Sequence, residues 1–201
     1  MTDLSRVEIL LHLAAIVVYG LTAMSAIAGV VLTREKLMKL ALRFAWLGFA
    51  VHSVALIARW VASGHGPYVS RYEVLSANAW VVVAVYLLWR RSAEWIRPFS
   101  ALVFPSVLLL LGIGVYTGPE VSALPPTFSG IWLALHVAFY LLAFSVSLMA
   151  ALVAVVHVFD ERLGRFRERF APAEALDSAS YRLAGLAFAF WGIGMLTGSI
   201  W

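Results

Sequence analysis

The sequence predicts an all-α protein, a polytopic bundle of about six transmembrane helices. Hydrophobic residues make up 63% of the 201 residues and charged residues only 13%, against about 45–50% and about 25% in soluble domains. Apolar stretches that can cross a hydrocarbon core of about 30 Å recur along the chain. These observations exclude an ordinary soluble enzyme and a disordered chain, and they favour one transmembrane domain over residues 1–201.

Six apolar stretches set the expected number of helices. They cover approximately residues 9–32, 41–62, 74–89, 99–116, 130–159 and 183–201. The first stretch is too long for the apolar region of a signal peptide, and the residues before it are not clearly basic. We therefore expect it to remain in the protein as a membrane span.

The positions of the basic residues predict how the helices are oriented. All lysines and arginines except Arg6, Arg59 and Arg71 lie in or beside the connections that follow the first, third and fifth stretches. Positively charged connections stay on the cytoplasmic side of a membrane. Both termini are therefore expected on the outer, periplasmic side. The net charge of +4 is then a topology signal, and we expect a lipid bilayer and no nucleic acid as partner.

The chain has no cysteine. This excludes disulfides, zinc–thiolate sites and iron–sulfur clusters built from its own residues, so metal chemistry falls to histidines or carboxylates. The motifs GxxxxGK[ST], HExxH and GxSxG are also absent from the sequence. Every carboxylate is expected at the end of a span or in a loop. A proton-driven carrier, which needs an acidic group inside a span, is therefore not expected.

The fifth stretch carries the clearest candidate site. Trp132, His136 and Tyr140 recur at intervals of four residues and share one face of a helix. His136 would lie about 9 Å along the helix from Gly130, near the outer interface. An imidazole among aromatic rings there suits haem, because haem iron binds histidine nitrogen and the porphyrin packs on aromatic rings. The spacing alone favours the alternative, a histidine bonded to a neighbouring helix beside interfacial aromatic anchors.

The second stretch places two ionisable residues on one face. His52 and Arg59 are seven residues apart, and ionisable residues at membrane depth are candidates for function. Arg59 could pair with a haem propionate or another anion, or simply extend to the interface. His52 could ligate a cofactor or hydrogen-bond across helices. In the first stretch, His12 and Tyr19 show the same seven-residue spacing.

Glycines and two connections add further expectations. The pairs Gly114/Gly118 and Gly194/Gly198 have the spacing that lets helices approach closely. Residues 160–172, DERLGRFRERFAP, are predicted either to lie as an amphipathic segment on the inner membrane surface or to form a plain basic loop. The loop SGHGPYVSRYEVL contains His65 and further polar side chains, more than a simple connecting loop needs.

Three segments resemble one protein family. Gly64-His65-Gly66-Pro67 with Tyr72-Glu73 and Leu75 resembles the outer-loop pattern GHxPxSxxYExL of the CcsA/ResC proteins of cytochrome c assembly, with Val69 at the serine position. The run from Trp132-Leu133 through His136-Val137 to Tyr140 resembles their W-L-x-x-H-V helix. Residues 176–182 and 196–201 resemble the helix leading into their tryptophan-rich outer motif. The likeness extends over about residues 41–201.

The resemblance implies a protein that handles a transient b-type haem and presents it at the outer face for covalent attachment to apocytochrome c. His136 matches one of two outer histidines that ligate the iron in that family. Trp132 and Tyr140 would then flank the porphyrin, and Arg59 or Arg71 would neutralise the propionates. His65 and His52 complete the candidate cofactor-binding set. The tryptophan-rich motif and the second histidine are expected after Trp201, so we expect a domain incomplete at its C-terminal end.

The resemblance also implies partners and a rival function. Apocytochrome c and a CcsB/ResB-like membrane subunit are the expected partners, and the bacterial inner membrane is favoured over the plastid thylakoid. Whether the chain acts as an enzyme is left open. The alternative is a HemX-like membrane regulator or assembly subunit without catalytic activity. A channel or carrier is disfavoured, because His52, Arg59 and scattered hydroxyl groups offer the only polar path.

Overall fold

The structure is a computed structural model that describes residues 3–120, 124–128, 130–159, 162, 164, 166 and 169–201. This part of the chain is helical and contains no strand. The elements are α1 (Asp3–Val31), α2 (Glu35–Ser63), α3 (Arg71–Ser92), the 3-10 helix η1 (Glu94–Phe99), α4 (Ser100–Thr117), α5 (Ile131–Val158) and α6 (Ala173–Ile200). Six helices, counting η1 with α4, are long and apolar enough to cross a membrane. The predicted all-α class and number of spans are confirmed.

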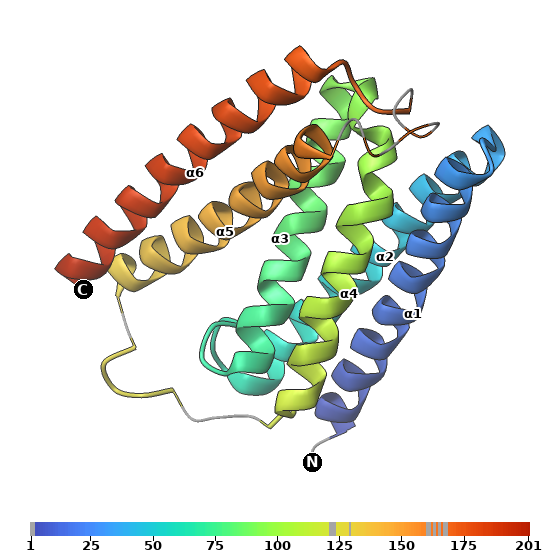
Figure 1. The fold of residues 1–201 in the computed structure, drawn as a ribbon. Coiled ribbons are helices and arrows are strands. Elements are labelled where there is room, and N and C mark those ends of the chain that lie inside the picture. Colours follow the sequence, from blue (N-terminus) through green and yellow to red (C-terminus); the bar gives the residue numbers. More distant parts are fainter. Residues whose placement is uncertain are drawn as a thin grey trace.

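Successive helices run in opposite directions, so the two termini lie at the same end of the bundle (Figure 1). We call this the terminal end, and it also holds the connection 64–70 and residues 118–120, 124–128 and 130. The opposite end, which we call the basic end, holds residues 32–34, the described residues between α5 and α6, and the helix η1. Arginines and lysines concentrate at the basic end, as their positions in the sequence predict.

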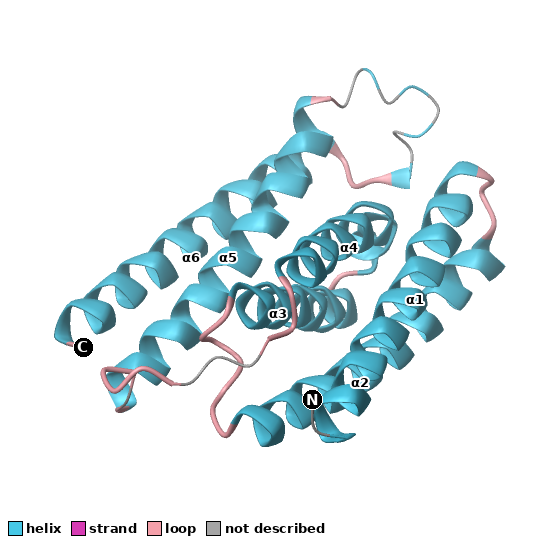
Figure 2. Cartoon of the chain, turned by 90° about the horizontal axis from the view of Figure 1, so that it is seen from below, coloured by secondary structure: helices cyan, strands magenta, loops and turns pink. Residues whose placement is uncertain are grey.

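The helices pack as three pairs. α1 lies beside α2 and α5 beside α6, while α3 and α4 lie between these outer pairs (Figures 1 and 2). α6 packs mainly on α5, and side chains on its other faces stay exposed, with Tyr181 81% and Phe188 80% accessible. Large apolar side chains on an outward face are what a lipid-facing helix requires.

Helix α6 begins at Ala173, ten residues before the apolar stretch that predicted it. Pro172 precedes the helix, and a proline is tolerated at a helix start because no amide hydrogen bond is needed there. The first turns are polar, so hydropathy alone missed them. Half of the predicted amphipathic segment before Pro172, residues 160, 161, 163, 165, 167 and 168, lies outside the described residues.

Aromatic side chains fill the centre of the bundle. The ring of Phe104 in α4 lies 5.6 Å from that of Tyr19 in α1 and 5.7 Å from that of Tyr86 in α3, centroid to centroid. All three residues are buried. Offset and edge-to-face rings at these separations attract one another beyond their burial. This contact joins the α1/α2 pair to the central helices.

Glycines allow the closest approaches between helices. A Cβ atom on Gly194 would overlap the ring of Tyr140, and one on Gly198 would overlap the imidazole of His136. The predicted close packing is therefore confirmed for this pair. A Cβ atom on Gly114 would lie 3.6 Å from the carbonyl oxygen of Tyr72 in α3, whereas Gly118 ends α4 at φ 89° and a Cβ there would meet nothing within 4 Å.

Gly48 in α2 provides a test of the α1/α2 contact. Its Cβ would lie 2.6 Å from Cε1 of Tyr19 and 3.3 Å from Cγ1 of Val18, so Gly48→Ala should lower the free energy of unfolding by about 1–3 kcal/mol through overpacking. Thermal unfolding in detergent measures the change. Gly20→Ala is the control, because its Cβ would meet nothing within 4 Å. Equal stability of the two variants would contradict the close contact.

Candidate functional site

His136 and Tyr140 line a pocket of about 190 Å³ at the terminal end. The pocket lies between the connection 64–70 and helices α3, α5 and α6. Its polar and aromatic lining consists of Tyr68, Asn78, His136, Tyr140, Phe144 and Trp191. The rings of His136 and Tyr140 are 4.4 Å apart, centroid to centroid. His136 and Tyr140 thus lie on one helix face, as their four-residue spacing predicts.

Two further tryptophans border this site, and sequence reasoning missed both. The ring of Trp191 lies 4.7 Å from that of Tyr140, and the ring of Trp201 lies 6.2 Å from that of His136. Their spacing with Gly194 and Gly198, in steps of three and four, was a usable signal of one helix face. Trp132, by contrast, is 43% exposed and is not among the pocket-lining residues.

The hydrogen bonding of His136 determines what its ring can do. Nδ1 lies 2.8 Å from the carbonyl oxygen of Gly194. A carbonyl only accepts, so Nδ1 carries the proton and Nε2 keeps its lone pair. No described group hydrogen-bonds to Nε2. Histidines that bind metal ions hold the second ring nitrogen in this way, on a backbone carbonyl or a carboxylate. Gly198 permits the arrangement because a side chain there would occupy the position of the ring.

The residues around His136 fit one face of a haem and one axial ligand. The pocket is smaller than the roughly 300–1,000 Å³ typical of small-molecule sites, so it does not enclose a porphyrin. An apolar groove of about 290 Å³ adjoins it and shares Pro67 and Leu141 as lining. Trp60 and Trp80 also line this groove. A flat apolar ring system suits such a surface.

Arg59 does not reach the surface, so the expectation that it extends to the interface is wrong. It is 1% exposed. Its Nε donates to Oε1 of Glu73 at 2.9 Å, and its terminal nitrogens donate to the carbonyl oxygens of Pro119 at 2.6 Å and Glu120 at 2.9 Å. Arg59 thus pairs with Glu73, and Oε2 of Glu8 also lies 3.6 Å from its guanidinium. A haem propionate would have to displace protein groups to reach this guanidinium.

Glu73 extends this contact to the connection before α3. Its Oε2 accepts hydrogen bonds from the amides of Val69 at 2.9 Å and Ser70 at 3.1 Å, while Ser70 Oγ accepts from the amide of Glu73 at 3.2 Å. This is a capping box, which satisfies the free amides at the start of α3. We call Arg59 and Glu73 with the backbone groups that they bind the Arg59 clamp. The clamp joins the connection 64–70 to residues 119–120.

His65 and His52 lie away from the pocket lining. His65 is 5% exposed, its Nδ1 donates to the carbonyl oxygen of Gly66 at 2.8 Å, and its ring lies 6.2 Å from that of Tyr68. His52 is fully buried with both ring nitrogens engaged, by Ser76 Oγ at 2.9 Å and the Tyr19 hydroxyl at 3.3 Å. Of the two roles considered for His52, the structure thus shows hydrogen bonding to neighbouring helices.

Glu8 and Glu73 lie near the starts of α1 and α3, at the ends of spans as expected, but both carboxylates are buried. Both lie within apolar helices long enough to cross a membrane, and they are 0% and 1% exposed. Oε1 of Glu8 lies 2.8 Å from Nδ1 of His12 and accepts from the Tyr72 hydroxyl at 2.8 Å. The spacing of Glu8 and His12, one helical turn apart, was the available signal.

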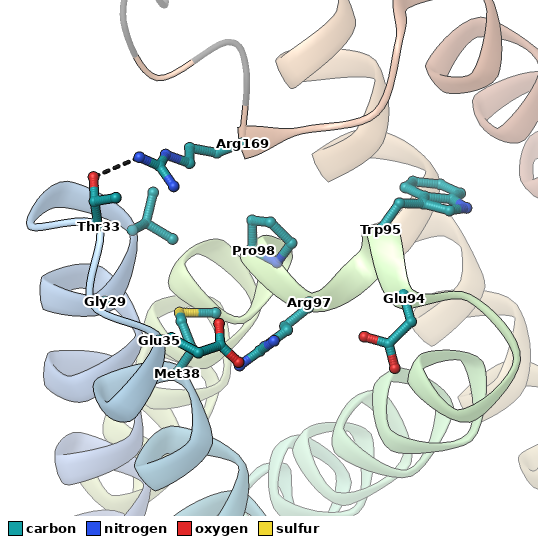
Figure 3. A pocket seen from close by; sticks show the side chains of 10 residues that line it. Gly29, Thr33, Glu35, Met38, Glu94, Trp95, Arg97, Pro98 and Arg169 are labelled. Atoms are coloured by element: carbon teal, nitrogen blue, oxygen red, sulfur yellow. Dashed lines mark hydrogen bonds and ion pairs between the residues drawn. The ribbon is translucent and has the colours of Figure 1, made fainter.

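A larger cavity, about 340 Å³, lies at the basic end. It is lined by the turn between α1 and α2, by η1 and by Arg169 (Figure 3). Arg97 forms an ion pair with Glu35, and Arg169 donates to the Thr33 hydroxyl at 2.5 Å. The charged groups are thus engaged with their neighbours, and none of the predicted haem-site residues is among its lining. We therefore place the candidate site at the terminal end.

Comparison with known proteins identifies relatives for most of the chain. A family model described as "Cytochrome C assembly protein" matches residues 72–201. "Cytochrome c biogenesis protein CcsA" of Chlamydomonas reinhardtii is 29% identical over 154 residues, covering 73% of this chain and 44% of the relative. The CcsA proteins of Prochlorococcus marinus subsp. pastoris and Nymphaea alba are each 27% identical, covering 74% and 73% of this chain and 56% and 58% of the relatives.

The chain spans about half the length of these curated relatives. No solved structure matches it significantly. The family-model match begins inside the Tyr72–Glu73 motif and includes α4, α5 and α6 with His136. Glu8, His12, His52 and Arg59 precede that match.

The Arg59 clamp generates a prediction for the terminal end. Arg59→Gln leaves the buried carboxylate of Glu73 without its cation, which should lower the free energy of unfolding by about 3–5 kcal/mol. Amide hydrogen exchange should accelerate in residues 64–70, because the clamp holds that connection. Arg90→Gln is the control: its ion-pair partner Glu94 is 83% exposed, and such a pair contributes about 0–1 kcal/mol. Unchanged exchange in residues 64–70 of the Arg59 variant would contradict the clamp.

Proposed function

Because the chain belongs to the cytochrome c assembly protein family, we propose that it binds haem at the terminal end of its bundle and presents it for covalent attachment to apocytochrome c. The observation that carries this proposal is the His136 ring, whose Nδ1 is held by the Gly194 carbonyl while Nε2 keeps its lone pair. The family match, which includes this histidine, supports the assignment of haem as the bound molecule.

Each side chain near His136 takes a role in holding the haem as a substrate. His136 Nε2 donates its lone pair to the iron, and Tyr140, Trp191 and Trp201 pack around the imidazole and keep water from it. Trp132, one turn before His136 and exposed, is available to the porphyrin from the surface. Since Arg59 is bound to Glu73, we assign the propionates to exposed Arg71 at the start of α3.

The remaining chemistry comes from partners. The chain has no cysteine, so the thiols that react with haem belong to the apocytochrome. Among the described residues the pocket offers one imidazole, and a second axial ligand therefore comes from elsewhere, through further chain or a CcsB-like subunit. In this proposal the terminal end faces the periplasm of a bacterial inner membrane, because the arginines and lysines concentrate at the other end.

Loss of haem on removal of His136 tests the proposal directly. In the detergent-purified chain, His136→Ala should reduce haem occupancy more than about tenfold, since the iron loses its protein ligand. The Soret band and the reduced α and β bands measure occupancy. His157→Ala is the matched control, because His157 lies on the same helix near the basic end. Equal haem binding in wild type and in His136→Ala would contradict the assignment of His136 as the iron ligand. Absence of haem from both would favour the HemX-like regulator.

The glycine beneath the imidazole gives a second test. Gly198→Ala places a methyl group where the His136 ring lies, so Nδ1 loses the Gly194 carbonyl and the ring loses its orientation. Haem affinity should fall by about 10–100-fold, the usual effect of removing such a supporting contact. Gly192→Ala is the control, with open space at its Cβ. Wild-type affinity in Gly198→Ala would show that the orientation of the ring does not matter.

A further inference from the structure

A second cluster of ionisable side chains lies between α1, α2 and α3, and haem presentation does not use it. We call Glu8, His12, Tyr19, His52 and Ser76 the core polar cluster. Each of them is at most 2% exposed. Polar and ionisable side chains at membrane depth are costly and mark pathways of ions or protons. This cluster therefore calls for a function of its own.

Two imidazoles of the cluster meet on one hydroxyl group. Nε2 of His12 lies 2.8 Å and Nε2 of His52 lies 2.9 Å from the same atom, Oγ of Ser76. A hydroxyl has one proton to donate and accepts through its lone pairs. When Ser76 donates its proton to one imidazole, the other imidazole donates to Ser76. The two histidines then have opposite hydrogen-bonding roles, and exchanging these roles transfers a proton.

The charges around the cluster favour the binding of one proton. Arg59 of α2 is positive, and Glu73 of α3 and Glu8 of α1 are negative. The other contacts are neutral: the Tyr72 hydroxyl on Glu8, the ring of Phe104 in α4 beside Tyr19, and the carbonyls of Pro119 and Glu120 on Arg59. With neutral histidines the buried groups carry one net negative charge, which an apolar surrounding penalises. One proton on an imidazole removes that charge.

Glu8 shows where this proton is stabilised. Its Oε1 contacts Nδ1 of His12 at 2.8 Å. Its Oε2 has no hydrogen-bond donor among the described groups and lies 3.6 Å from the Arg59 guanidinium. The charge of this carboxylate is therefore balanced mainly through His12. A protonated His12 donates from Nδ1 to Glu8 and from Nε2 to Ser76.

We propose that the core polar cluster is a proton-binding site that shares one proton between His12 and His52 through Ser76. In the transfer, the N–H bond at Nε2 of His12 breaks as Ser76 Oγ takes that proton, and the O–H bond of Ser76 breaks as Nε2 of His52 takes the other. The hydroxyl is regenerated, and one positive charge moves from α1 to α2. No other reactant is needed.

The cluster lies in the terminal half of the bundle. Along α1, Glu8 and Tyr19 are separated by about 16 Å at 1.5 Å per residue, roughly half of a 30 Å hydrocarbon core. Tyr19, at the inner end of the cluster, contacts the buried ring of Phe104. The cluster therefore holds its proton inside the bundle, with Glu8 as its member nearest the terminal end.

The experiment is a pH series on the full 201-residue chain with ¹⁵N-labelled histidine, in lipid bilayers, with ring signals assigned by His12→Asn and His52→Asn. In wild type, protonation of His12 and His52 should form one coupled step, with the two protonated fractions together adding up to one proton. In Ser76→Ala the coupling should be lost, so that His12 gains the proton alone. Ser76→Thr, which keeps the hydroxyl, should restore it.

Two further variants keep the test falsifiable. Glu8→Gln removes one negative charge without changing size, and both imidazoles should then stay neutral where wild type binds its proton. Ser106→Ala is the control for loss of a hydroxyl, because among the described groups Ser106 hydrogen-bonds only to the Leu102 carbonyl of its own helix. In this variant His12 and His52 should titrate as they do in wild type. Independent protonation of His12 and His52 in wild type would overturn the proposal. Unchanged proton uptake in Glu8→Gln would also overturn it.

Discussion

The buried guanidinium of Arg59 is the contact on which the terminal end depends. It binds the Glu73 carboxylate and two backbone carbonyls of residues 119 and 120, while Glu73 caps the start of α3. A buried cation is tolerated only when its donors are matched in this way, because an unpaired charge costs several kcal/mol. One side chain of α2 thus fixes the start of α3 and both neighbouring connections of the terminal end.

The pocket at His136 follows from this arrangement. The connection 64–70, held through Glu73, supplies Pro67 and Tyr68 to the pocket, and α5 supplies the imidazole. Helix α6 then completes the site. Because Gly194 and Gly198 have no side chains, they leave room for the rings of Tyr140 and His136. The orientation of the His136 ring therefore depends on packing. Its Nδ1 reaches the carbonyl oxygen of Gly194 because Gly198 has no Cβ atom to displace the ring.

The sequence predicted what depends on one helix at a time. Hydropathy gave six spans, and four-residue spacing placed His136 beside Tyr140. It did not predict that Arg59 pairs with Glu73, or that Ser76 lies between His12 and His52, because such contacts depend on which helices are neighbours and how each is rotated. The placement of Trp191 and Trp201 around the site likewise requires the position of α6 on α5.

The ring state of His136 in the haem-free chain tests the central claim most directly. Nitrogen NMR of the ¹⁵N-histidine-labelled protein at neutral pH distinguishes the two neutral tautomers of this imidazole. The account predicts a ring protonated at Nδ1, with an unprotonated Nε2 ready to bind iron. A ring protonated at Nε2 would contradict it, because the Gly194 carbonyl would then not hold the imidazole and its lone pair would point away from the site.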